Sequence, residues 1–225
     1  METVRETSGD LRRPRMIVVT GGPGAGKTAV LEVARRHFCR HVQFTPEAAS
    51  ILFRGGFPRG LLPREERAAQ RAIFHVQLEL ERMSFEEPRA EVVLCDRGTL
   101  DGAAYWPEGT ESFWTETGMT RSEMLLRYDA VIHLMTPPVT AGYDHTKPVR
   151  IESPEQAALI DQRLALAWAD HPHRYVVPWT DGFFSKLSLA MALIQDLLPE
   201  NCHDHHRAPA RMEHVGRSTA QRVSG

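Results

Sequence analysis

The eight residues from Gly21 to Thr28 constrain what this chain can fold into more than any other segment. Their sequence, Gly-Gly-Pro-Gly-Ala-Gly-Lys-Thr, matches the pattern G-x-x-x-x-G-K-[ST] at every fixed position. In this pattern the glycines let backbone N–H groups turn inward around phosphate oxygens, and the following helix presents its positive N-terminus to the same anion. We therefore predict a phosphate-binding loop (P-loop) formed by Gly21, Gly22, Pro23, Gly24, Ala25, Gly26, Lys27 and Thr28.

The neighbouring segments supply the context that this motif requires. The β-branched apolar run 16–20 predicts a buried strand before the loop, and residues 28–37 have helical spacing after it. A chance glycine-rich turn is the alternative, but it gives no purpose to the Lys27-Thr28 pair. In a P-loop, Lys27 reaches the β and γ phosphates of a nucleoside triphosphate, and the Thr28 hydroxyl ligates Mg²⁺.

The rest of the chain alternates short apolar strands with amphipathic helices. We expect strands at 16–20, 42–45, 91–95, 130–134 and 175–177. We expect helices at 28–37, 47–54, 64–85, 120–128, 153–169 and 183–198, with one helical turn at 101–105. The apolar face predicted for the long helix 64–85 consists of Ile73, Val76, Leu80 and Met83. This alternation predicts an α/β P-loop NTPase fold in three αβα layers around a mainly parallel five-stranded sheet.

The pattern also predicts one domain with a disordered segment at each end. Residues 1–14 form a charged lead, residues 15–198 form the nucleotide-binding domain, and residues 199–225 form a polar tail. The tail contains clustered histidines, which we assign to a disordered segment rather than to a metal site.

Composition argues against two classes of partner. The formal net charge of −2 gives no electrostatic case for nucleic acid or a membrane surface, and no apolar run is long enough to span a bilayer. The N-terminus lacks the apolar core of a signal peptide. The three cysteines, Cys39, Cys95 and Cys202, are widely spaced and match no metal or disulfide pattern, so we expect a cytoplasmic protein with reduced thiols.

Two acidic residues follow predicted strands. Ligands of open parallel sheets bind at the carboxyl ends of the strands. Asp96 comes after four apolar residues, where an acid holds Mg²⁺, and we favour this over capping of the next turn. Glu47 follows Pro46 at a strand-to-helix turn, where a carboxylate accepts the proton of an acceptor hydroxyl or positions a water. The alternative for Glu47 is a first-turn acid that complements the helix dipole.

Other charged residues have two interpretations each. Arg97 binds the acceptor or the transferred phosphoryl group, or it pairs with a neighbouring acid. Asp101 hydrogen-bonds the ligands of the metal, or it caps a helix. Lys147 and Arg150 lie in the loop 142–152, which is a mobile lid whose cations reach the transferred phosphate, or a solvated charged loop.

Several of these pieces together resemble a known family. The P-loop, Pro46-Glu47-Ala48-Ala49, Asp96-Arg97-Gly98-Thr99-Leu100-Asp101 with Ala104-Tyr105, and 168–179 occur in this order over roughly residues 15–198. This order is similar to the P-loop family, grouped with AAA ATPases, that contains the ribosylnicotinamide kinase domain of NadR. The layout also resembles deoxyribonucleoside kinases, although their lid is richer in arginine. These resemblances imply Glu47 as base, Asp96 as the acid linked to Mg²⁺, and Arg97 as a substrate contact.

The residues and the resemblance together predict a small-molecule kinase. ATP·Mg²⁺ would donate its γ-phosphoryl group to a small-molecule hydroxyl acceptor, which the resemblance implies to be nucleoside-like. The catalytic candidates are Lys27, Glu47, Asp96, Arg97 and Arg150. ATP is favoured over GTP because the sequence has no Asn-Lys-x-Asp guanine motif. The alternative is a nucleotide-dependent switch that hydrolyses slowly and is recognised by a protein partner.

Overall fold

The computed structural model describes residues 13–60, 62–139, 153–180 and 182–203. Within these residues one parallel sheet has the strand order β2-β3-β1-β4-β5. Its strands are β1 (Arg15–Thr20), β2 (Val42–Thr45), β3 (Val92–Asp96), β4 (Ala130–Leu134) and β5 (Arg174–Val177). The predicted five-stranded parallel α/β fold is confirmed.

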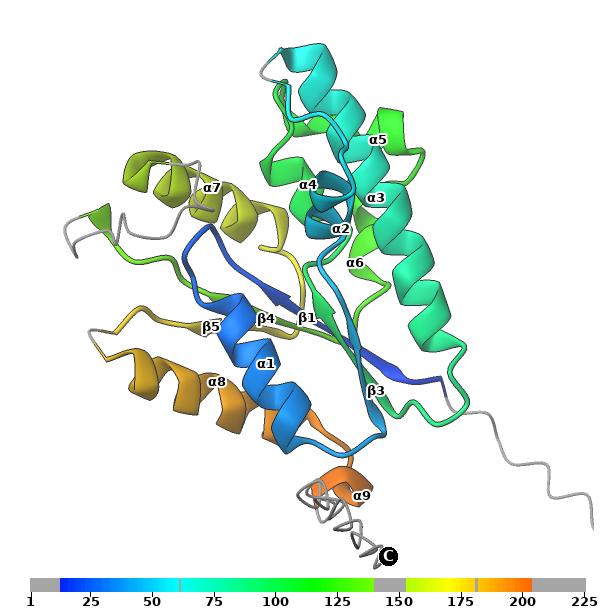
Figure 1. The fold of residues 1–225 in the computed structure, drawn as a ribbon, viewed down its shortest axis with the longest axis vertical. Coiled ribbons are helices and arrows are strands. Elements are labelled where there is room, and N and C mark those ends of the chain that lie inside the picture. The colour runs from blue at the N-terminus through cyan, green and yellow to red at the C-terminus, as the bar shows by residue number, and fades with distance from the viewer. Residues whose placement is uncertain (1–12, 61, 140–152, 181, 204–225) are drawn as a thin grey trace, which may run out of the picture.

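Helices cover both faces of this sheet, as Figure 1 shows. They are α1 (Lys27–His37), α2 (Ala48–Arg54), α3 (Pro63–Phe85), α4 (Asp101–Ala104), α5 (Thr110–Thr117), α6 (Arg121–Leu125), α7 (Pro154–Ala167), α8 (Phe183–Leu197) and α9 (Glu200–His203). None of the described helices is both long and apolar enough to cross a membrane.

The core consists of two apolar clusters, one on each face of the sheet. In β1, Ile17 and Val19 belong to the cluster with α1 and α8, whereas Met16 and Val18 belong to the cluster that contains Phe74 of α3. Successive strand residues point to opposite faces, so an uninterrupted apolar run is what a strand buried on both sides requires.

The position of β1 places the P-loop at the centre of the sheet edge. β1 lies between β3 and β4, so its carboxyl end faces loops from both neighbours. Its register pairs Val19 with Asp96, and β2 pairs Thr45 with Cys95 on the other side of β3. The segments that follow β1, β2 and β3 therefore emerge along one edge, which is where an open parallel sheet binds its ligands.

The predicted apolar face of α3 is wrong at Met83 and incomplete elsewhere, since Ile73, Val76 and Leu80 are only half-buried. Met83 is 69% exposed, and the buried positions of the helix include Phe74, Gln77 and Glu81. The two polar side chains are tolerated there because they are hydrogen-bonded: Gln77 Nε2 donates to Glu81 at 2.9 Å, and Tyr128 OH donates to Glu81 at 2.7 Å. Periodicity of apolar residues does not reveal such a face.

Two other segments differ from expectation. The sequence predicts no regular structure around residues 110–117, where the structure has α5. The predicted disordered tail begins at residue 199, but Glu200–His203 form the short helix α9, and Cys202 on it is 3% exposed in the core cluster shared with α1. The start of the predicted tail is therefore wrong, and the rest of it lies outside the described residues.

Candidate functional site

The P-loop joins β1 to α1 through glycines that other residues cannot replace. Gly21 has a φ of 143°, and a Cβ atom there would lie 2.2 Å from the carbonyl oxygen of Leu134. Gly26 is the N-cap of α1 with a φ of 95°, in the left-handed region. Because glycine has no side chain to cap the helix, the first N–H groups of α1 remain for an anion.

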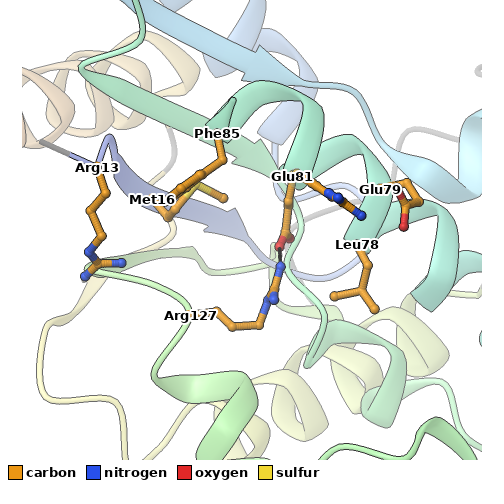
Figure 2. Close-up of a pocket in the computed structure, with 8 residues that line it drawn as sticks. Arg13, Met16, Leu78, Glu79, Glu81, Phe85 and Arg127 are labelled. Atoms are coloured by element: carbon orange, nitrogen blue, oxygen red, sulfur yellow. Dashed lines mark hydrogen bonds and ion pairs between the residues drawn. The ribbon is translucent and has the colours of Figure 1, made fainter. Parts of the chain in front are cut away.

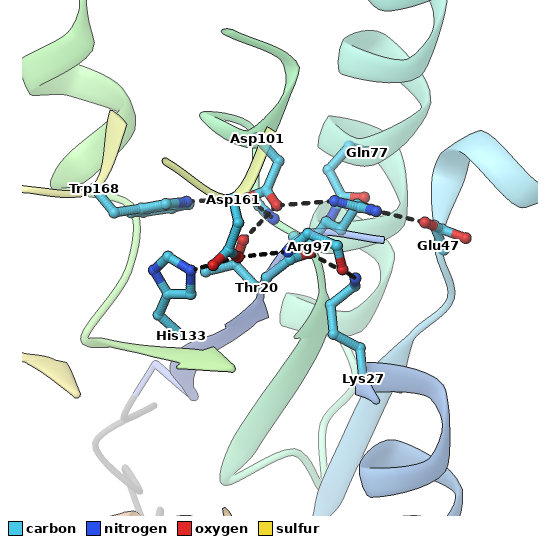
Figure 3. Close-up of polar contacts among 12 residues, drawn as sticks. Thr20, Lys27, Glu47, Gln77, Arg97, Asp101, His133, Asp161 and Trp168 are labelled. Carbon is cyan, nitrogen blue, oxygen red and sulfur yellow. Dashed lines mark hydrogen bonds and ion pairs between the residues drawn. The ribbon is translucent and has the colours of Figure 1, made fainter. Parts of the chain in front are cut away.

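The Lys27 side chain is buried against the backbone of the P-loop. Its Nζ donates to the carbonyl oxygens of Gly21 at 2.7 Å and Gly22 at 3.2 Å. Burial lowers the pKa of Lys27 to about 8, with a smaller contribution from Arg97 in the same direction and opposition from Asp96. The ammonium is therefore held against backbone oxygens, from which it can turn to a phosphate (Figure 3).

Asp96 fits the role of a magnesium ligand. It is the last residue of β3, and its buried Oδ1 has no hydrogen-bond partner among the described residues. Burial raises the pKa of this carboxyl to about 6, and the positive charge of Lys27 opposes the rise. A buried carboxylate oxygen without a partner is costly unless a cation compensates it. Hard oxygen donors such as Asp96 and the exposed Thr28 suit Mg²⁺.

Glu47 and Arg97 form an ion pair across the ends of β2 and β3. Arg97 Nε donates to Glu47 Oε1 at 2.7 Å, and Ser50 Oγ donates to Glu47 Oε2 at 2.5 Å. Burial alone would raise the pKa of Glu47, but the charge and hydrogen bond of Arg97, with help from Ser50, lower it to about 2. Glu47 is the N-cap of α2 rather than a residue of its first turn. The carboxylate is thus ionised at neutral pH and fixed in orientation.

Asp101 anchors Arg97 and the end of β1. One carboxylate oxygen accepts from Thr20 Oγ1 at 2.6 Å and Arg97 Nη1 at 3.4 Å, and the other accepts from Gly98 N and Trp168 Nε1, each at 3.1 Å. The N-cap of α4 is the preceding leucine, so Asp101 is not a cap. Its oxygens are already occupied by protein donors. Arg97 thus pairs with neighbouring acids, which was the alternative interpretation of this residue. Its left-handed φ of 73° lets the chain turn there.

A second polar chain, which sequence reasoning missed, fixes the other side of the P-loop. Asp161 on α7 accepts from the backbone N–H of Gly22 at 2.8 Å and lies 3.0 Å from His133 Nε2. Arg174 Nη2 lies 2.8 Å from His133 Nδ1, and because arginine is only a donor, Nδ1 accepts and Nε2 carries the proton to Asp161. The bonds from His133 and Gly22 overcome the opposing effect of burial and lower the pKa of Asp161.

Lys186 on α8 holds a third side of the loop. Its Nζ donates to the carbonyl oxygens of Ala25 at 2.8 Å and Met135 at 2.5 Å. Burial lowers the pKa of Lys186 to about 8, against the opposing charge of Asp161. The sequence offers no local signal for Asp161, His133 or Lys186, because each lies within an ordinary helix or strand pattern and acts through contacts distant in the chain.

Comparison with known proteins agrees with this geometry. The sequence profile of a family described as an AAA domain matches residues 16–184, which is most of the chain. The chain belongs to this AAA domain family. A search of curated proteins finds none that matches.

Two solved structures of NadR have folds similar to that of this chain. The crystal structure of NadR protein in complex with NR has a TM-score of 0.59 and 16% identity, over 81% of this chain and 51% of that one. The crystal structure of NadR protein in complex with NAD and AMP-PNP has a TM-score of 0.56 and 15% identity, over 81% of this chain and 49% of that one. The chain thus spans about half the length of these proteins, and the likeness is one of fold.

The catalytic candidates from the sequence divide into two groups. Lys27, Glu47, Asp96 and Arg97 come together at one edge of the sheet, where each alters the pKa of at least one other. Figure 3 shows Lys27, Glu47 and Arg97 of this group. Arg150, together with the rest of the predicted lid, lies outside the described residues.

A surface pocket lies elsewhere on the molecule, away from the P-loop. Figure 2 shows this hollow between the start of β1, at Met16, and the last turns of α3. It lies at the opposite end of β1 from the P-loop. Glu81 is its buried acid, and this side chain is already paired with Arg127 Nη2 at 2.6 Å. Glu81 and Arg127 thus form a structural ion pair in the wall of this pocket.

Proposed function

We propose that the protein is a small-molecule kinase that transfers the γ-phosphoryl group of ATP to a hydroxyl of a nucleoside-like acceptor. The P-loop binds the triphosphate, and Asp96 with Thr28 holds Mg²⁺. When bound, this ion would supply positive charge that neutralises the phosphates. The observation that carries the proposal is the ionised Glu47 carboxylate, which Arg97 holds at 2.7 Å beside the strand end that bears Asp96.

Lys27 supplies the positive charge at the phosphates. At pH 7 a lysine with a pKa of about 8 is mostly protonated, and an arriving triphosphate favours that form further. A preorganised cation in a buried site stabilises the charge that develops on the transferred group, and it needs no rearrangement at the moment of transfer.

Glu47 orients the acceptor rather than acting as a strong base. A carboxylate with a pKa of about 2 is a weak proton acceptor at neutral pH. Phosphoryl transfer has a loose transition state that requires little help from a base, so the acceptor hydroxyl needs above all to be aligned. Glu47 does this by accepting its hydrogen bond, and it takes the proton late. Arg97 keeps the Glu47 carboxylate ionised and fixes its orientation.

The identity of the two substrates has separate support. ATP is favoured because the sequence lacks the guanine motif. A nucleoside-like acceptor is supported by the likeness in fold to a NadR structure in complex with NR and to another in complex with NAD and AMP-PNP. The lid role of Arg150 and a cytoplasmic location stay predictions from the sequence.

The proposal is tested by measuring ADP release from ATP·Mg²⁺ across a panel of nucleosides, sugars and vitamins. A kinase releases ADP only when its acceptor is present. The second candidate function is a nucleotide switch, and it is favoured by the fact that Glu47 can orient a water as readily as a hydroxyl. A switch would release ADP slowly and at the same rate with every compound of the panel.

Two variants separate the roles of the acids. Glu47→Gln should leave ATP·Mg²⁺ affinity nearly unchanged and lower the transfer rate by about 10²-fold, the low end for a positioned acid–base group. Asp96→Asn should weaken nucleotide binding and raise the Mg²⁺ concentration required. Glu86→Gln, at the exposed C-cap of α3, is the matched control and should change neither. If Glu47→Gln and Asp96→Asn respond alike to Mg²⁺, the assignment of Glu47 to the acceptor is wrong.

A further inference from the structure

The structure brings together three side chains that the sequence keeps apart. Cys39 follows the end of α1, His41 precedes β2, and Cys202 lies on α9. Their ligand atoms all lie within 4.8 Å of one another. Figure 1 shows α9 beside the carboxyl-terminal end of α1, at the end of that helix away from the P-loop. The spacing of the cysteines in the sequence suggested no metal pattern, because Cys202 reaches the others only through the fold.

The distances suit a tetrahedral ion. A zinc ion with Zn–S of about 2.3 Å and Zn–N of about 2.0–2.1 Å separates a sulfur and a nitrogen ligand by about 3.5 Å. Cys39 Sγ and His41 Nδ1 are 3.5 Å apart. Cys202 needs to move by no more than about 1 Å to complete the same geometry, since two sulfurs on one zinc lie about 3.8 Å apart.

The simpler interpretation is that both cysteines only fill space. Each belongs to the apolar cluster around α1 and α8, and buried cysteine commonly behaves as a small apolar residue. That interpretation also applies to Cys95, which is buried in the cluster on the other face of the sheet. It does not explain why Cys39 and Cys202 converge on the half-buried ring of His41. Cys95 therefore provides an internal control.

We propose that Cys39, His41 and Cys202 form a binding site for a soft divalent transition metal of the zinc class. Two thiolates and an imidazole select such an ion over Mg²⁺, which prefers oxygen ligands. The three side chains leave the fourth position of a tetrahedral ion to a ligand from outside this set. The site ties α9 to the segment between α1 and β2, so its role is structural. It does not depend on the proposed kinase activity.

The test uses the full chain, stripped with a chelator in a phosphine reductant and titrated with Co²⁺ and then Zn²⁺ in the absence of nucleotide. We expect one equivalent of Co²⁺ to bind with a thiolate-to-cobalt charge-transfer band, and Zn²⁺ to displace it. Zn²⁺ at about 100 times its Kd should raise the melting temperature by roughly 5–10 °C. A folded wild-type protein without the charge-transfer band would overturn the proposal.

Variants identify the ligands. Cys39→Ser and Cys202→Ser each remove one of the two thiolates, so each should clearly weaken the band at saturating Co²⁺ and lower Co²⁺ affinity by at least about 100-fold, whereas Cys95→Ala should retain both. Should either serine variant fail to fold, His41→Gln at a half-buried position provides the same test and should lower affinity by at least about tenfold. Retention of full affinity in His41→Gln, or loss of the band in a folded Cys95→Ala, would refute the three-ligand site.

Discussion

Replacing Glu47 with glutamine should lower the free energy of unfolding at neutral pH by about 3 kcal/mol. Burial opposes ionisation of Glu47, but Arg97 and Ser50 bring its pKa from the ordinary value of 4.5 to about 2. At about 1.4 kcal/mol per pH unit, this difference corresponds to about 3 kcal/mol of stabilisation. Removing one partner of a buried ion pair costs a similar amount, about 3–5 kcal/mol.

The pH dependence of this loss follows from its sign. A carboxyl whose folded-state pKa is depressed stabilises the protein fully above its unfolded pKa, near 4.5, and loses that contribution as the pH falls toward about 2. Glutamine has no charge to titrate at any pH. The difference between wild type and Glu47→Gln should therefore be constant above about pH 5 and shrink below it.

The measurement is urea unfolding followed by tryptophan fluorescence at several pH values between about 7 and 3. Glu86→Gln is the control, because Glu86, the exposed C-cap of α3, pairs with the exposed Arg82 at 3.0 Å and should contribute nothing measurable. A Glu47→Gln loss below about 1 kcal/mol at pH 7 would refute the reasoning. A loss that persists unchanged at about pH 3 would do so as well.

Other predictions concern the P-loop and its metal ligand. Lys27→Ala should abolish triphosphate binding in titration calorimetry while the circular dichroism spectrum stays native, because one preorganised phosphate contact is lost. Gly21→Ala should lower the melting temperature strongly, since its Cβ would lie 2.2 Å from the Leu134 carbonyl. The pKa of Asp96 is raised to about 6, so its negative charge is lost as the pH falls through that value. Mg²⁺-dependent nucleotide affinity should therefore drop by roughly tenfold from pH 7 to 5. In Asp96→Asn this pH-dependent drop in affinity should be missing.

The sheet was predictable because each strand has its own local signal. β1 and β3 are short apolar runs followed by a glycine turn or ending at an acid, the other strands are short segments rich in β-branched or aromatic residues, and the P-loop fixes the order of the first strand and helix. The buried face of α3 was not predictable, because Gln77 and Glu81 are buried through partners supplied by later segments. Arg97 offers its carbonyl oxygen to Gln77 at 3.0 Å, and Arg127 pairs with Glu81. A polar residue gives no sign in the sequence that such a partner exists.

The candidate site divides in the same way. Asp96 and Glu47 could be proposed because carboxyl ends of parallel strands meet at one edge, so a charge directly after a strand has a known position. The contacts of Asp161 with Gly22, and of Cys202 with Cys39, link residues far apart in the chain. Only the packing of α7 and α9 brings these groups together, and no spacing rule contains that information.

Asp161 and Lys186 hold the P-loop backbone at Gly22 and Ala25 through contacts from α7 and α8. A loop that neighbouring helices already fix has little conformational entropy left to lose, so the ordering cost of association falls mainly on the incoming nucleotide. We expect that Lys27 contacts a phosphate by rotating its ammonium away from the carbonyl oxygens of Gly21 and Gly22, without a refolding of the loop. Calorimetry of triphosphate binding should accordingly show a heat capacity change that buried surface alone accounts for, with no added contribution from coupled folding.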